Sequence, residues 1–226
     1  MRKSRNRPSA ARSTADTDLT KRAQILDQAA KLFRRHGYAA TTLRQIAEAT
    51  GIKAGSIYYH FSSKEEILVE VMDTGIRMVA AAVREKVDAL PSGASNRERI
   101  AAAVEGHLYG LLHHGDFTSA NIRIYGQIPQ SAKDRHRIVR LDYADYWDRL
   151  FAKARRSREL RSDVPLSVMR LFVLGSLNFT VEWYNPKRGS FESFARSISA
   201  LVFDGILNLG KELRRPPGRR RVAEPA

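Results

Sequence analysis

The chain has 226 residues, 43% of them hydrophobic, which is enough to bury a sizeable core in one large domain or two small ones. Its 39 lysines and arginines against 24 acidic residues give a net charge of +15, which favours a polyanionic partner, nucleic acid before an anionic membrane surface. The absence of cysteine excludes disulfides, thiolate metal sites and a cysteine nucleophile, and it fits a reducing cytoplasm.

The first 18 residues are rich in Arg, Ser and Ala without apolar periodicity, so we expect a flexible basic arm there. They lack the apolar run of a secretory signal. No uncharged apolar run in the chain approaches the roughly 20 residues that span a bilayer. We therefore expect a cytoplasmic protein with no membrane partner.

Helical periodicity begins at Ile25, and Gly37 marks the end of the first helix as a C-cap glycine would. Thr42 and Gln45 have the spacing of a capping box, which predicts a short second helix over 43–50. Gly51 then permits a sharp turn. A third short helix is expected over 54–61, and overlapping S-x-x-E boxes after it open a longer fourth helix.

The rest of the chain also has a helical pattern, with no strand-like alternation. Further helices are expected over 97–113, 118–125, 133–156, 166–184 and 191–209. The sequence thus predicts an all-α protein of about nine helices. A three-helix helix-turn-helix domain occupies 19–73, with the helix-turn-helix at about 42–61. A helical bundle follows over 74–210, and 211–226 form a disordered basic tail.

At about 100° per residue, Ile57, Phe61 and Ala54 share the inward face of the third helix. The outward face carries Gly55, Ser56 and Tyr59, with Tyr58 and His60 at its edges. No carboxylate occurs from 51 to 64. A slim polar face with donors at its rims suits a recognition helix in the major groove. A catalytic Tyr-His cluster is the alternative, but it lacks a nucleophile, an orienting acid and a metal-ligand partner.

The stretch "TTLRQIAEATGIKAGSIYYHFSSKEEIL" resembles the N-terminal DNA-binding domain of the tetracycline-repressor (TetR) family, and the resemblance runs from about residue 21 to 72. It implies groove contacts from the outward face of the third helix and phosphate contacts from residues around it. The DNA-binding residues that it implies are Thr42, Arg44, Lys53, Gly55, Ser56, Tyr58, Tyr59, His60 and Lys64.

The resemblance also implies a homodimer on a palindromic operator, with a divergent helical domain that senses a small molecule. It implies no enzymatic activity, and we expect neither a cofactor nor a metal. The segment from 175 to 206 is similar to family members that control fatty-acid or sterol catabolism and sense acyl-CoA thioesters. An acyl-CoA or another hydrophobic molecule is therefore the expected effector.

Polar and aromatic residues of the predicted bundle are candidates for contact with that effector. They are Arg123, Tyr125, Trp147, Asn178 and Trp183. Arg123 lies in a mostly apolar short helix, where it either meets a carboxylate or phosphate of the ligand or is a surface arginine or part of an internal ion pair. The sequence thus predicts a ligand-responsive repressor. The alternative is a basic protein that binds nucleic acid without sequence preference and without ligand sensing.

Overall fold

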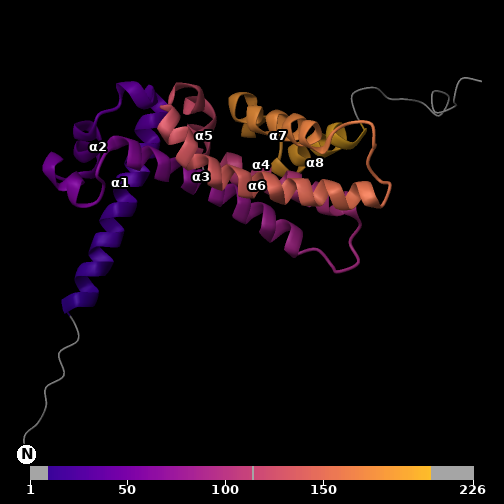
Figure 1. Ribbon diagram of the computed structural model, residues 1–226, viewed down its shortest axis with the longest axis horizontal. Helices are drawn as coiled ribbons and strands as arrows, with labels where there is room; N and C mark the ends of the chain where they lie inside the picture. The colour runs from indigo at the N-terminus through magenta and orange to yellow at the C-terminus, as the bar shows by residue number, and fades with distance from the viewer. Residues whose placement is uncertain (1–9, 114, 205–226) are drawn as a thin grey trace, which may run out of the picture.

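The computed structural model describes residues 10–113 and 115–204, and every regular element in those ranges is a helix. The chain forms two parts along its long axis, with α1 projecting from the smaller one (Figure 1). In chain order the elements are α1 (Ala10–Ala40), α2 (Leu43–Thr50), η1 (Ala54–Tyr59), α3 (Lys64–Asp88), α4 (Asn96–His113), α5 (Gly115–Ile124), η2 (Tyr125–Gln127), α6 (Gln130–Arg156), α7 (Leu166–Trp183), η3 (Pro186–Arg188) and α8 (Phe191–Asp204).

The predicted all-α fold is confirmed, with eight α-helices in the described ranges and η1 in the place of the third predicted helix. Two local expectations were wrong. The backbone of 10–18 is the helical start of α1 rather than part of a flexible arm, because its Ala and Arg residues favour helix and continue an established one. The third helix is a 3-10 helix of six residues. Residues 1–9, the predicted end of the last helix after 204 and the basic tail lie outside the described residues.

Local signals in the sequence set the boundaries of α2. The Thr42 side chain accepts a hydrogen bond from the Gln45 backbone N–H, and the Gln45 side chain accepts one from the Thr42 N–H, so the predicted capping box is present. Gly51 ends the helix in the left-handed region with φ 71°. Gly37 has φ 79° and breaks α1 near its end. These two glycines take backbone conformations that other residues rarely adopt.

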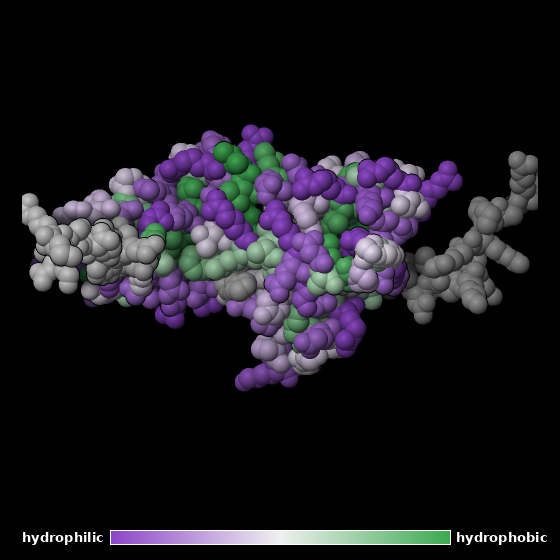
Figure 2. All heavy atoms as spheres, turned by 90° about the horizontal axis from the view of Figure 1, so that it is seen from below, coloured by the Kyte–Doolittle hydropathy of each residue, from purple (hydrophilic) through white to green (hydrophobic). Residues whose placement is uncertain are grey.

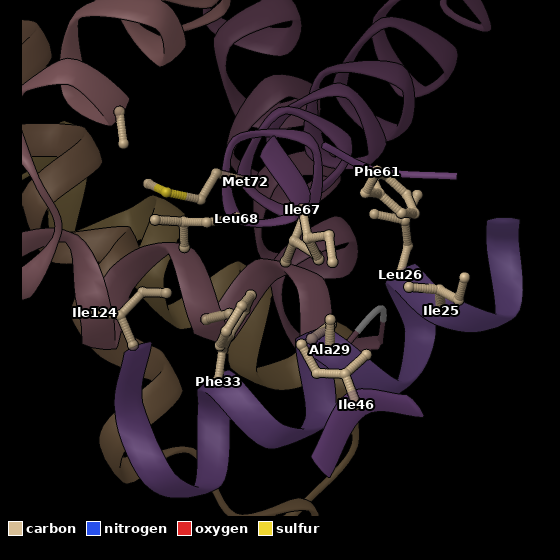
Figure 3. Packing of buried hydrophobic residues seen from close by; sticks show 14 of the residues in the cluster. Ile25, Leu26, Ala29, Phe33, Ile46, Phe61, Ile67, Leu68, Met72 and Ile124 are labelled. Atoms are coloured by element: carbon tan, nitrogen blue, oxygen red, sulfur yellow. The ribbon is translucent and has the colours of Figure 1, made fainter. Parts of the chain in front are cut away.

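The smaller part of the molecule is held by one hydrophobic core. Side chains from α1, α2 and α3 point toward one another in it, and Ile124 of α5 joins them (Figure 3). Phe33, Ile46 and Ile67 are fully buried there. Ala120, Ile128 and Ala132 also belong to this core, so α5 and the start of α6 complete a domain that the sequence analysis confined to residues 19–73.

A second core holds the larger part, where α3, α4, α6, α7 and α8 meet around the fully buried Trp147. The two cores divide along α3 between Met72 and Val79. Helices α3 and α4 approach closely, since a Cβ on Gly106 would lie 2.7 Å from the Ala82 carbonyl oxygen. Only glycine permits that approach of two backbones.

Not all of the apolar surface is enclosed. On the face shown in Figure 2, hydrophobic side chains reach the surface in patches between hydrophilic ones. Helix α7 contributes much of the exposed apolar surface, with Leu171 at 64%, Phe172 at 70% and Phe179 at 62% exposure. In the described part of the chain, no helix combines the length and the apolar character that a membrane span requires.

Candidate functional site

The edge formed by α2 and η1 presents two adjacent tyrosines to solvent. Tyr58 is 63% exposed and Tyr59 is 89% exposed. On the other side of the same short element, Ile57 and Phe61 are buried in the smaller core and fix its position. The predicted division into inward and outward faces therefore holds for these four residues. It was wrong for Ala54, which is exposed because it is the first residue of η1 and lies outside that core.

Cationic groups flank the two tyrosines. Arg44 on α2 and Lys53 before η1 are exposed, and neither forms an ion pair with any other described residue. Gly55 is exposed with open space where a Cβ would stand, so another molecule can approach its backbone. Ser56 and His60 are half-buried beside them. The edge thus combines exposed aromatic surface, hydroxyl donors and unpaired positive charge, a composition that suits a nucleic-acid surface.

Lys64 has a structural role that the sequence did not reveal. Its Nζ donates hydrogen bonds to the backbone carbonyls of Tyr38, at 2.9 Å, and Thr41, at 2.7 Å, and it lies 4.3 Å from the centre of the Tyr38 ring. Burial lowers the pKa of this ammonium group from its ordinary value. Lys64 therefore links the first turn of α3 to the end of α1 and to the residue that follows it. Two of the three N–H donors of Lys64 are used within the chain, which leaves one for any phosphate.

A cavity of about 370 Å³ lies in the larger part of the molecule, between α3, α4, α5, α6 and α7. Its walls combine apolar residues with a few polar ones. The lining residues that matter here are Gly75, Val79, His107, Tyr125, Arg140, Tyr143, Arg170 and Asn178. This size and this mixture of surfaces suit an organic ligand that is largely apolar and carries a few polar groups.

The structure brings two of the five predicted effector residues to this cavity. Tyr125 and Asn178 line it. Arg123 is exposed outside it and pairs with Glu182, with its Nε 2.9 Å from the carboxylate, so in this structure it is a surface arginine in an ion pair. Trp147 is fully buried behind the cavity wall. Trp183 lies at a separate surface pocket beside Phe194.

A second pocket, of about 360 Å³, adjoins the cavity and shares Tyr125, Arg140, Ala144 and Arg170 with it. Lys133 and Arg137 also line this outer pocket, against one acidic lining residue, Asp134. The Arg140 guanidinium donates to the Tyr125 hydroxyl, and Arg170 pairs with Asp148 at 2.9 Å. The cavity therefore opens between α6 and α7 into a cationic groove.

A buried polar chain forms part of the cavity wall. His107 Nδ1 lies 2.7 Å from the Tyr143 hydroxyl, and His107 Nε2 lies 3.1 Å from Asn178 Oδ1. Burial lowers the pKa of His107 from 6.5 to about 4, although the contact with Asn178 raises it slightly. Burial also raises the pKa of Tyr143, so this hydroxyl keeps its proton. All three side chains are consequently neutral at neutral pH.

Sequence reasoning missed His107, Arg140 and Arg170 as cavity residues. His107 has no local signal that marks it as a cavity residue, and the two arginines lie on long helices, α6 and α7. Their placement depends on how α4, α6 and α7 face one another, which no local pattern encodes. Within the described ranges, no group of three or more His, Cys, Asp or Glu side chains is placed to hold a metal ion.

Two family models match the chain. Residues 25–71 match the bacterial regulatory proteins of the tetR family, and residues 93–206 match the tetracyclin repressor-like C-terminal domain. The HTH-type transcriptional repressor KstR2 of Rhodococcus jostii (strain RHA1) is 27% identical over 192 residues, which cover 82% of this chain and 91% of that protein.

Solved structures share the fold. AibR in complex with isovaleryl coenzyme A and operator DNA has a TM-score of 0.71 at 22% identity, and the match covers 81% of this chain and 98% of that one. FadR from Bacillus subtilis in complex with stearoyl-CoA has a TM-score of 0.69 at 20% identity, over 82% of this chain and 99% of that one.

Replacing Lys64 tests whether its hydrogen bonds stabilise the fold. Lys64→Met removes the ammonium donor from the Tyr38 and Thr41 carbonyls, of which Tyr38 keeps the Thr41 N–H at 3.4 Å, so we expect the free energy of unfolding to fall by about 1–3 kcal/mol. Lys53→Met is the matched control, because Lys53 is exposed and unpaired, and it should change that free energy by less than about 0.5 kcal/mol. Urea denaturation measures both. Equal stability of the two variants would contradict this role.

His107 predicts a pH dependence of stability. Its folded pKa of about 4 lies below its ordinary value of 6.5, so between these values the unfolded chain binds a proton that the folded chain does not. The free energy of unfolding should therefore fall by about 3 kcal/mol through this group as the pH drops from 6.5 to 4. His107→Gln lowers stability at pH 7 but removes this component. Parallel pH profiles of the two proteins, measured by urea denaturation, would refute the assignment.

Proposed function

Because the chain belongs to the TetR family of bacterial regulatory proteins, we propose that it is a ligand-responsive transcriptional repressor. It binds a palindromic operator as a homodimer and releases it when a small molecule occupies the cavity. The observation that carries this proposal is the exposed tyrosine edge of η1, at 63% and 89% exposure, flanked by unpaired cations and anchored from behind by the core.

At the operator, Tyr59, Ser56 and Gly55 face base edges in the major groove, and Lys53 enters with them. Thr42, Arg44, Tyr58 and His60 contact the phosphates on either side. Exposure supports these roles, since Tyr59 protrudes furthest and Gly55 leaves room for close approach. Lys64 mainly holds the edge in place and offers one remaining N–H to the backbone.

The homodimer forms through α7 and α8. The exposed apolar residues of α7, with Leu201 of α8, make a face that costs free energy in water unless it is covered. A second copy covers it with the same face in a two-fold arrangement. Such a pair presents two η1 edges, which meet half-sites about one duplex turn or a multiple of it apart.

The effector is an acyl-CoA thioester. AibR and FadR, which share this fold, were solved in complex with isovaleryl coenzyme A and stearoyl-CoA. In this chain the cavity offers apolar walls to an acyl group. The adjoining groove offers Lys133, Arg137, Arg140 and Arg170 to the phosphates of coenzyme A. The site is therefore apolar in the cavity and cationic in the groove, as the ligand is apolar at its acyl group and anionic at its phosphates.

Release of the operator passes through α5. Thr118, Asn121 and Ile122 line the cavity, whereas Ala120 and Ile124 of the same helix belong to the core behind the DNA-binding edge. The Asn121 side chain donates to the Met72 carbonyl of α3, and Arg34 of α1 pairs with Asp116 at 2.8 Å. A ligand that displaces α5 shifts α1 and α3, so the two edges no longer match the operator spacing.

Removing the most exposed side chain of the edge tests DNA reading. We expect Tyr59→Ala to weaken binding to a duplex selected from a random library by roughly tenfold or more, as loss of one base contact does. Fluorescence anisotropy at fixed salt measures the affinity. Ile138→Ala, which truncates another highly exposed side chain, on α6 at 75% exposure, is the control and should bind as the wild type does.

Two results would count against this reading. Unchanged affinity of Tyr59→Ala, with its dimer intact by sedimentation, would remove the assignment of that edge. Equal affinity of the wild type for selected and unselected duplexes, with a steep dependence on salt, would instead favour a basic protein without sequence preference. Deleting the terminal residues 1–18 and 211–226 would then abolish binding.

A charge on the α7 face tests the dimer. Phe172→Asp places a carboxylate on a residue that is 70% exposed in the single chain and is covered in the proposed dimer. We expect a monomer in analytical ultracentrifugation and a large loss of operator affinity, because one chain contacts only one half-site. Ile138→Asp adds the same charge to α6, away from this face, and should remain dimeric. If both variants stay dimeric, the interface lies elsewhere.

A further inference from the structure

The buried polar chain ends in a hydrogen-bond donor at the cavity. Asn178 lines the cavity and its Oδ1 faces His107 Nε2 at 3.1 Å. No hydrogen bond from its Nδ2 reaches another residue in the part of the chain that the structure describes. The half-buried amide is open to solvent in the cavity, so an apolar ligand that displaces the solvent leaves its N–H pair unsatisfied, whereas a ligand with an acceptor there does not.

The hydrogen bonds of this buried polar chain all run in one direction, from Tyr143 through His107 to Asn178. His107 is neutral, so one ring nitrogen accepts and the other donates. The Tyr143 hydroxyl, at 2.7 Å, donates to Nδ1, and Nε2–H then donates to Asn178 Oδ1. In the opposite arrangement the Tyr143 O–H would have no acceptor among the side chains that the structure describes. Asn178 is thereby held with its oxygen toward His107 and its NH₂ group away from it.

The surroundings keep this arrangement rigid. His107 and Tyr143 are only 3% and 8% exposed, and their rings stack with centres 6.0 Å apart. Trp147, which is fully buried, packs edge-on against both rings. A donor that is fixed before the ligand arrives loses little entropy on binding, so it discriminates well between ligands.

Much of the cavity wall is apolar, and the side chains of its polar residues Thr118 and Asn121 donate to the Leu111 and Met72 carbonyls within the chain. Ile76, Val79, Leu111 and Leu174 contribute hydrocarbon surface, so a plain alkyl chain satisfies the wall but leaves the Asn178 amide without a partner. We propose that Asn178 Nδ2 donates a hydrogen bond to a keto oxygen on the acyl group of the effector, and that the cavity therefore selects oxo-acyl thioesters over unsubstituted ones of equal length. This inference rests on the proposed acyl-CoA effector and specifies its acyl group.

In this arrangement Asn178 is the contacting residue, and His107 and Tyr143 are positioning residues. The measured quantity is a ratio of affinities, because damage to the fold weakens all ligands together whereas loss of a specific donor changes their ratio. One neutral hydrogen bond, including the penalty of leaving its donor unpaired, corresponds to a preference of about tenfold.

The experiment uses the full-length chain and calorimetric titration with hexanoyl-, octanoyl- and decanoyl-CoA. Each is paired with its analogue carrying a keto group on the penultimate carbon. We expect the wild type to bind the oxo member about tenfold more tightly for at least one length and to release its selected duplex at correspondingly lower concentration. Asn178→Leu, which is similar in size and apolar, should bind both members alike.

A second variant guards against a folding defect in Asn178→Leu. Tyr143→Phe keeps the ring and removes the hydroxyl that fixes His107, so the ratio of the oxo to the plain affinity should fall toward one, whatever the change in overall affinity. A preference that survives in both variants would overturn the role of Asn178. Equal binding of both members by the wild type would overturn this inference and leave the acyl-CoA proposal standing. If none of the six thioesters binds, both fail, while operator binding is judged separately.

Discussion

Helix α3 passes without a break through both hydrophobic cores, and the rest of the structure depends on that continuity. Its first half shares a core with α1, α2 and α5, its second half packs against α4 and α6, and Gly75 between them lines the cavity. At Gly75 a Cβ would lie 2.6 Å from the Phe117 carbonyl oxygen, so α5 presses on α3 where the two cores divide. The cavity and the smaller core are therefore joined by packed helix rather than by a flexible linker.

The edge that we propose for DNA contact is also held in place by packing against its neighbours. η1 is short and makes few hydrogen bonds of its own, so its position comes from Ile57 and Phe61 in the core and from Lys64 on the turn after α1. The exposed tyrosines can protrude because the residues around them are fixed. Burial, rather than helix propensity, gives this small element its shape.

Much of this could be predicted from sequence where the signals are local. The capping box at Thr42, the glycine at 51 and the alternation of buried and exposed residues after it are encoded within a few positions, and the structure has them. The cavity could not be predicted in this way. Asn178 and His107 are 71 positions apart, and their meeting depends on how two long helices face each other. The same limit applies to Arg123, because its partner Glu182 is 59 positions away and no local pattern identifies it.

The neutrality of the His107 chain has a consequence for the route by which a ligand enters. With the pKa of His107 lowered to about 4, the deep wall of the cavity carries no charge at neutral pH, while the arginines stand at the opening. A charged group gains little by moving inward and much by staying at the groove. An amphiphilic thioester would therefore enter with its hydrocarbon end first. The depth of the cavity would then limit the length of the acyl chain that fits.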